Sequence, residues 1–491
     1  MSIPPRDDRE GASVPGGEAS ATHVGSELPA NPLSRPYLPI TLSVLALVTI
    51  VAFENMAVST AMPAVVHDLH AVRAYGFAFS VMLTTQLLGI VLAGVWTDRS
   101  GPLPGTFVGQ ILLAVGSAVC GFATRLDVFL LGRALTGLGG GLLVVLMYVI
   151  AGRVYPDEVR PKLFTYVSAA WILPSLLGAP LSAWLTETFS WRWVFWIVVI
   201  PVALTAAVMA RAHGRVDTSA LEVAVSSRDH RDHVRAAWGG VGIALSAGLL
   251  QLGIATEAAG GAAGPERAGA SPARLGLAAA GVIGIAALLP VLLPRGTWRM
   301  ARGIPSVILA RALFTASFFG VISYIPLFLH GQRGASLQVA GLALALGSLG
   351  WAIGAWYQGH PTMTLPRPRL VTIGGGVLAL GTALLGVIAW LDIKAVLVVP
   401  ALVIAGLGMG LGVTTTTVLA LELSTLEEQA HAASQLQLAD VLGSVLGIAA
   451  VTGVFAAGHV PGLDNPLYGG LFLGLGIVAV LVVPAGQRIR T

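Results

Sequence analysis

Three ionisable residues, Glu54, Arg133 and Asp440, lie inside long apolar runs of this 491-residue sequence. Between Tyr37 and Val66, for example, Glu54 is the only charged residue. A charged side chain in hydrocarbon is costly, so it is retained where it has a partner or faces water. A carboxylate that is exposed in turn to the two sides of a membrane can bind protons on one side and release them on the other. We therefore predict that Glu54 and Asp440 are candidate proton-binding residues and that Arg133 needs an acid as its partner.

The sequence alone does not identify the partner of each charge. Arg133 needs an acid, but the sequence does not decide whether Glu54 works with Arg133, with Asp440 or with neither. In one alternative Arg133, six residues after Asp127, extends to the membrane interface. In another, Asp440 is a structural acid bonded to a neighbouring helix.

Glu54 also belongs to a polar stripe. Asn55 and Ser59 lie four residues apart and therefore share one face of a helix, with Glu54 beside them. Lipid offers such a stripe no hydrogen-bond partner, so we expect it to face protein or water.

The composition indicates that most of the chain is embedded in lipid. Hydrophobic residues make up 55% of it and charged residues 11%, with a mean hydropathy of +0.81. Segments of roughly 20 apolar residues can cross a bilayer as helices. We predict an all-α polytopic membrane protein with fourteen spans, near 38–62, 74–96, 104–124, 128–151, 163–186, 193–211, 236–256, 274–293, 312–329, 335–358, 370–390, 395–421, 430–456 and 467–484. The seventh and eighth are the weakest, so twelve spans is the alternative.

Loop charges predict the orientation, because Lys and Arg collect on the cytoplasmic side. With fourteen spans and a cytoplasmic N-terminus, 20 of the 28 Lys and Arg residues fall in cytoplasmic segments and seven in outer loops. Arg133 is the remaining one. We therefore expect a multi-pass protein of the cell membrane with both termini in the cytoplasm.

Two short patterns repeat along the chain. The run GLGGGLL begins at Gly137 and GLGMGLG at Gly406, while SLLG ends at Gly178 and SVLG at Gly447. The members of both pairs are 269 residues apart. An equal spacing in two places indicates an internal repeat, and many secondary transporters are built from two six-helix halves related by such a repeat. We divide the chain into a disordered cytosolic tail (1–36), an N-terminal six-helix half (37–212), a linker with two extra transmembrane helices (213–311) and a C-terminal six-helix half (312–486).

The loop GVWTDRSGPLP resembles the signature of the major facilitator superfamily, through Gly94, Asp98, Arg99 and Gly101. Gly94 should permit close helix approach, and Gly101 a tight turn. Pro102 and Pro104 stand where that family usually has basic residues. The resemblance implies the major facilitator fold and a gating role for this loop.

Two further runs resemble motifs of that family. LLGRALTGLGGG is similar to its fourth-helix motif, in which the arginine, here Arg133, is tied to proton coupling, and its antiporter motif is matched at Gly178 and Pro180, although Ala179 separates them. SWRWVFW resembles the sixth span of the fourteen-span drug:proton antiporter branch. The resemblance implies proton-coupled drug efflux, with uptake by symport as the alternative.

The predicted spans contain few polar residues that could line a substrate cavity. A mostly apolar cavity suits hydrophobic or amphipathic small molecules. The candidates for its wall are Asn55, Gln86, Gln110, Tyr148, Trp171, Gln251 and Tyr324.

Other classes of protein lack support in the sequence. It has no metal-binding or phosphate-binding motif that would indicate an enzyme, a cofactor or a metal site. It has no repeated selectivity filter of a channel, and no contiguous basic patch for nucleic acid. We expect a monomer whose partners are a small-molecule substrate, protons and the lipid bilayer.

Overall fold

In the computed structural model of the chain, the described residues are 31–35, 37–155, 159–213, 230–259, 272–360, 363–425, 429–460 and 463–489. The tail expected at 1–36 therefore lies almost wholly outside the described residues, as do residues 214–229 and 260–271 of the expected linker.

The described residues form helices and no β-strand, as the hydropathy pattern predicts. Helices satisfy their backbone hydrogen bonds internally, which a hydrocarbon environment requires. In chain order they are α1 (Leu38–Asp68), α2 (Tyr75–Ser100), α3 (Pro102–Phe122), α4 (Leu126–Val154), α5 (Arg160–Thr188), α6 (Arg192–His213), α7 (His230–Ala259), α8 (Pro272–Leu292), α9 (Ile304–Pro326), α10 (Leu337–Gln358), α11 (Arg367–Trp390), α12 (Val398–Glu422), α13 (Gln429–Gly458), α14 (Asn465–Val480) and α15 (Val482–Arg488).

Thirteen segments of the described chain are long and apolar enough to cross a membrane. One of them combines α14 and α15. The seventh of the fourteen expected spans corresponds to α7, whose apolar part, Trp238–Ile254, is shorter. The structure therefore confirms an all-α polytopic protein, with α7 as its weakest candidate span.

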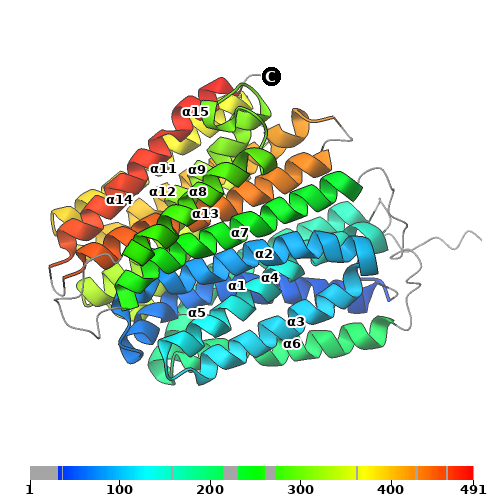
Figure 1. The fold of residues 1–491 in the computed structure, drawn as a ribbon, viewed down its shortest axis with the longest axis horizontal. Coiled ribbons are helices and arrows are strands. Elements are labelled where there is room, and N and C mark those ends of the chain that lie inside the picture. The colour runs from blue at the N-terminus through cyan, green and yellow to red at the C-terminus, as the bar shows by residue number, and fades with distance from the viewer. Residues whose placement is uncertain are drawn as a thin grey trace, which may run out of the picture.

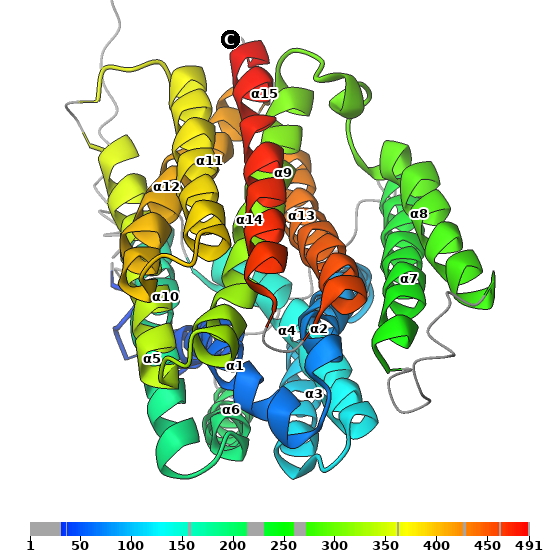
Figure 2. The same cartoon turned by 90° about the vertical axis from the view of Figure 1, so that its left-hand side faces the viewer.

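The helices form two groups with a hairpin at their boundary. Figure 1 shows α1 to α6 in its lower part, the last helices in its upper part, and α7 running between them. Contacts between the groups run mainly from α5 to α10 and from α2 to α13. α7 packs on α2 and α13, and α8 packs on α7, farther from the other helices (Figure 2). The hairpin therefore covers one of the two boundaries between the groups.

The repeated glycines make equivalent contacts in the two halves. A Cβ atom on Gly137 or Gly141 of α4 would overlap the backbone of α2, and one on Gly406 or Gly410 of α12 would overlap the backbone of α10. α5 starts at Arg160 and α13 at Gln429, again 269 residues apart. The internal repeat predicted from sequence is therefore a repeat of helix packing as well.

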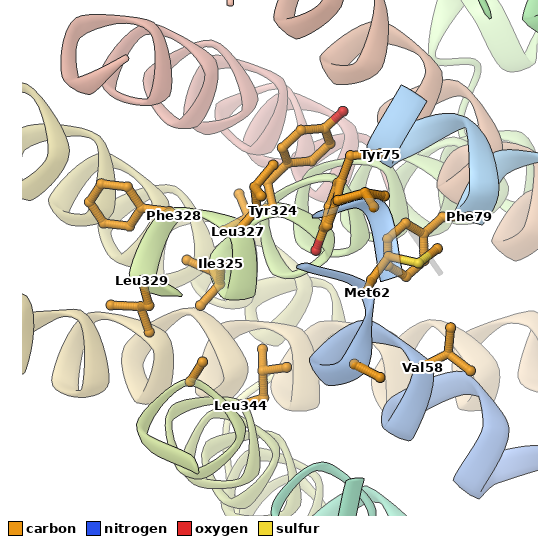
Figure 3. Packing of buried hydrophobic residues seen from close by; sticks show 14 of the residues in the cluster. Val58, Met62, Tyr75, Phe79, Tyr324, Ile325, Leu327, Phe328, Leu329 and Leu344 are labelled. Atoms are coloured by element: carbon orange, nitrogen blue, oxygen red, sulfur yellow. The ribbon is translucent and has the colours of Figure 1, made fainter. Parts of the chain in front are cut away.

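One apolar cluster joins the two halves, at the end of the bundle where α1 ends and α2 begins. It includes Met62, Tyr75, Tyr324, Phe328 and Leu344, from both sides of the boundary (Figure 3). We call this the sealed end. Toward the opposite end, one large cluster comes from α1, α3, α4, α5 and α6, and another from α7 to α9 and α11 to α15 with Leu87 of α2. The described halves are thus sealed against each other at one end.

An arginine and an aspartate brace each half near the sealed end. Arg192 donates to the carboxylate of Asp68 (3.1 Å) and to the carbonyl of Ala123 (3.1 Å), which ties α6 to the ends of α1 and α3. In the other half Arg333 pairs with Asp392 and donates to the carbonyl of Ile388. These contacts hold the helix ends of each half together.

Candidate functional site

Glu54 and Arg133 form a buried ion pair between α1 and α4. Arg133 Nη1 lies 2.9 Å from Glu54 Oε1, and the two side chains are 1% and 2% exposed, respectively. Thr136 also hydrogen-bonds the Glu54 carboxylate. Arg133 therefore does not extend to the membrane interface, and Glu54 is the acid that it needs. Of the predicted polar stripe, Glu54 and Ser59 are buried in protein, whereas Asn55 is only half-buried.

The rest of the Arg133 guanidinium contacts α2. Nε donates to the carbonyl of Ala78 (3.4 Å), and Nη2 lies 2.6 Å from the sulfur of Met82. The close approach comes from the glycine run of α4, because a side chain at Gly137 would overlap the carbonyl of Met82. The pair thus connects α1, α2 and α4, and a change in its charge acts on all three helices.

Asp440 has a different partner, Arg311 of α9. Arg311 binds both carboxylate oxygens of Asp440 through Nε and Nη2. Its Nη1 donates to the carbonyl of Val413 and to the hydroxyl of Thr417. The pair is 12% exposed at Arg311 and 20% at Asp440. This network joins α9, α12 and α13, so Asp440 is bonded to neighbouring helices.

Arg311 is a residue that the sequence reasoning missed. It counted as a cytoplasmic loop residue, because the ninth span was expected to begin at residue 312. The helix begins at Ile304, so Arg311 lies inside it. The apolar residues Val307, Ile308 and Leu309 before it are the signal that could have extended the span.

A small apolar pocket of about 10 Å³ lies between α1, α4 and α5, and neither Glu54 nor Arg133 lines it. The last of its α1 residues, Val51, is one turn before Asn55, whose side-chain amide donates to the Val51 carbonyl (3.1 Å). Two predicted cavity residues lie in this pocket, Tyr148 and Trp171, and their side chains hydrogen-bond each other. Its lining is Leu47, Val48, Val51, Leu143, Val144, Met147, Tyr148 and Trp171, from α1, α4 and α5.

Three other predicted cavity residues lie in packing contacts. Gln110 is buried and donates to Thr205 of α6 (3.3 Å), while Gln251 of α7 donates to Thr84 of α2 (2.6 Å). Tyr324 is buried within the sealed end. The prediction that these three line a cavity is therefore corrected. Asn55 is half-buried, and Gln86 is buried.

The structure shows one of the two local features expected of the predicted loop motif. Gly101 has φ +72° between α2 and α3, the left-handed region that favours glycine, so the tight turn is present. Gly94 is exposed, and a Cβ there would meet no atom within 4 Å, so its expected close helix approach is wrong. Asp98 and Arg99 lie in the last turn of α2, but their side chains are outside the described part.

The predicted motif of α5 lies where three helices meet. A Cβ on Gly178 would contact Phe53 of α1, the neighbour of Glu54. The next residue, Ala179, faces Gly341 of α10, where a Cβ would lie 2.8 Å from its carbonyl oxygen. Pro180 follows within the helix. The motif thus lies between α1 and the other half of the bundle.

Comparisons with known proteins agree on the fold. A family model described as Major Facilitator Superfamily matches residues 44–448. The multidrug transporter protein MdtP of Bacillus subtilis is 26% identical over 416 residues, which cover 83% of this chain and 73% of MdtP. Multidrug resistance protein 3 of the same organism is 29% identical over 221 residues, which cover 45% of this chain and 41% of that protein. A solved POT family transporter in complex with 5-aminolevulinic acid has a TM-score of 0.63 at 15% identity, covering 91% of this chain and 95% of its own.

Proposed function

Because the chain belongs to the major facilitator superfamily, we propose that it exports a hydrophobic or amphipathic small molecule in exchange for protons, by alternating access. Members of this superfamily are membrane transporters and not enzymes. The names of the two Bacillus relatives, both multidrug proteins, support export. The observation that carries the proton coupling is the buried pair of Glu54 and Arg133.

The pair links protonation to the shape of the site. A proton on Glu54 removes the negative partner of Arg133 and leaves a buried, uncompensated guanidinium, which is strongly unfavourable. Helices α1, α2 and α4, which contact the pair, then favour an arrangement in which Arg133 meets water or another partner. The apolar pocket shares α1 and α4 with the pair, but at about 10 Å³ it has room for about one water molecule. A cargo site between these helices therefore requires them to move, and a change in the charge of the pair acts on the same helices.

In this proposal Asp440 has a structural part rather than a direct role in coupling. Both of its carboxylate oxygens are held by Arg311, whose other donors reach α12. The network keeps α9, α12 and α13 together while the halves move. This assignment replaces the expectation that Asp440 carries protons.

The loop charges support a cytoplasmic N-terminus, and on that basis we place the sealed end outside the cell. The arrangement described here then faces inward, with the pocket on the cytoplasmic side of the seal. Alternating access requires the seal to part when the opposite end closes.

Everted membrane vesicles with an imposed proton gradient test the coupling. Uptake is screened with a panel of dyes, antibiotics and lipids, and Glu54→Gln is expected to abolish gradient-driven uptake of any compound that the wild type accumulates. Asp127→Asn is the matched control, because Asp127 forms an exposed pair with Arg125. Gradient-driven uptake by Glu54→Gln would show that the coupling assignment is wrong.

The same vesicles separate export from uptake. Accumulation in everted vesicles means export by antiport, whereas accumulation only in right-side-out vesicles means uptake by symport. Ala179, which separates Gly178 from Pro180 in the antiporter-like motif, is the feature that keeps symport as the alternative.

A further inference from the structure

The connection between α8 and α9, residues 293–303, lies at the membrane surface. It joins two segments that are long and apolar enough to cross a membrane, one ending at Pro290 and the other beginning at Ile304. α9 runs from this connection toward Tyr324 in the sealed end. The connection is therefore at the opposite end of the bundle, which is the cytoplasmic end in the orientation adopted above. Figure 2 shows it passing from α8 to α9 near the end of α15.

The exposed side chains of this connection are basic and aromatic. We call four of them the basic patch: Arg295, Trp298, Arg299 and Arg302. Trp298 is 59% exposed. The sequence has no acidic residue between Glu266 and Asp392, and within the described part of the chain none of the three arginines forms an ion pair. The patch is therefore a local concentration of positive charge with free hydrogen-bond donors.

The backbone of the connection is anchored on both sides of Trp298 and Arg299. Thr297 is 3% exposed, and Met300 packs against the apolar cluster that α7 to α9 share with α11 to α15. The Met300 amide donates to the Thr297 carbonyl (3.1 Å). Met300 has φ +51°, a left-handed conformation that is unfavourable for a residue with a Cβ atom. The two anchors thus hold a strained turn that presents Trp298 and Arg299 at the surface.

A fourth arginine reaches the patch from the other end of the sequence. Arg488 of α15 is exposed, and its Nη1 donates to the carbonyl of Arg299 (3.4 Å). Its guanidinium group therefore adds to the positive charge beside the patch. This charge density is a property of the folded protein, because Arg488 is distant in sequence.

These side chains suit an anionic lipid headgroup. Guanidinium groups bind phosphate oxygens through paired hydrogen bonds, and tryptophan is enriched where headgroups meet the hydrocarbon. Basic residues near the cytoplasmic surface are attracted to anionic lipids. A zwitterionic lipid also carries a phosphate, but its ammonium group is repelled by several arginines. The patch should therefore prefer a lipid with a net negative charge.

We propose that the basic patch binds the phosphate group of an anionic phospholipid in the cytoplasmic leaflet, with Trp298 inserted at the level of the headgroups. The proposal goes beyond transport and does not depend on the cargo or on proton coupling. A free phosphate ion offers the arginines the same chemistry. The lipid differs from it in having a glycerol backbone and acyl chains for Trp298 to contact.

Native mass spectrometry of the purified full-length protein in detergent tests the preference. The protein is titrated with dioleoylphosphatidylglycerol or dioleoylphosphatidylcholine, and the affinity for the first bound lipid is compared. We expect the wild type to bind phosphatidylglycerol at least about tenfold more tightly than phosphatidylcholine. Arg295→Gln/Arg299→Gln/Arg302→Gln should reduce this ratio to about twofold or less.

A second triple variant controls for total charge. Arg35→Gln/Arg211→Gln/Arg369→Gln removes three exposed arginines from other segments expected on the cytoplasmic side, and it should keep the tenfold preference to within about a factor of two. Retained binding of phosphatidylcholine shows that each variant is folded. The proposal is overturned if the wild type binds the two lipids equally, if the variant of the patch keeps the preference, or if the control variant loses it.

Two further measurements distinguish a lipid from a free ion. Trp298→Ala should weaken binding of phosphatidylglycerol about threefold, whereas Trp390→Ala, an exposed tryptophan at the other end of the bundle, should leave it unchanged. Inorganic phosphate in millimolar excess should not displace the lipid. Displacement by phosphate, or equal binding by the two tryptophan variants, would show that the patch does not recognise a phospholipid.

Discussion

The rings of Tyr75 and Tyr324 lie 5.1 Å apart across the boundary between the two halves. The Tyr75 hydroxyl donates to the carbonyl of Ser323 on α9 (2.8 Å), and the Tyr324 hydroxyl to Thr452 on α13 (3.3 Å). Two tyrosines from helices of different halves thus form the centre of the sealed end (Figure 3). These contacts must break if the halves separate at this end.

Gly76→Ala should open the sealed end. A Cβ at Gly76 would overlap Thr452 Oγ1 and Tyr324 Oη, so the halves must move apart to accommodate it. Spin labels at Arg73→Cys and Lys394→Cys, both exposed, report the separation, and the native Cys120 is buried. We expect a longer distance distribution in Gly76→Ala. Gly376→Ala, where a Cβ meets no atom within 4 Å, is the control. An unchanged distribution in Gly76→Ala would contradict the seal.

Arg133→Gln should be more destabilising than loss of both members of its pair. The single variant leaves Glu54 buried without a counter-charge, a cost of about 3–5 kcal/mol, whereas Glu54→Gln/Arg133→Gln leaves no charge. Unfolding by sodium dodecyl sulfate in mixed micelles measures the difference. Asp127→Asn, in an exposed pair, should cost at most about 1 kcal/mol. A double variant no more stable than Arg133→Gln would refute the electrostatic account.

Thr84→Val should loosen α7 from the N-terminal half. The substitution removes the acceptor of the Gln251 side-chain amide in a buried contact and should cost about 1–3 kcal/mol. Adding Gln251→Leu removes the unsatisfied donor and should recover part of this loss. Hydrogen exchange of α7 amides, compared among the two variants and the wild type, provides the measurement. Equal protection in all three would mean that other contacts hold the hairpin.

If the chain has fourteen spans, the connection between α7 and α8 lies on the outer side of the membrane. A cysteine at Gly264 should then react with an impermeant maleimide in intact cells, as should one at Arg73, while one at Arg369 should react only after permeabilisation. If Gly264→Cys behaves like Arg369→Cys instead, α7 and α8 do not both span, and the twelve-span alternative holds.

Exchange of an uncharged cargo for one proton should be electrogenic, since each cycle moves one positive charge. In everted vesicles at equal pH on both sides, an inside-positive potential imposed with valinomycin and external potassium should therefore drive uptake of an uncharged compound that the screen identifies as cargo. Valinomycin with equal potassium concentrations on the two sides, which imposes no potential, is the control and should give no such uptake. Uptake that does not depend on the membrane potential would indicate an electroneutral exchange and contradict this prediction.

Much of the fold is a local property of the sequence. A run of apolar residues long enough to cross a bilayer must form a helix there, because its backbone has no other hydrogen-bond partners. The effect of the glycines at 137 and 406 is also local. Because glycine has no Cβ atom, a helix that carries it can approach the backbone of a neighbouring helix closely at that position. The span pattern and the repeat could therefore be read without a structure. Gly94 shows the limit, because the same residue type meets no neighbour there.

The sequence by itself determined that Glu54, Arg133 and Asp440 need partners, because the cost of a buried charge depends only on the charge and its apolar surroundings. Only the tertiary structure decided which partners they have. Arg133 meets an acid 79 residues away and Asp440 meets Arg311, 129 residues away. Such pairing depends on which helices are adjacent and on the register between them. Both follow from the packing of whole helices, which no single stretch of sequence specifies.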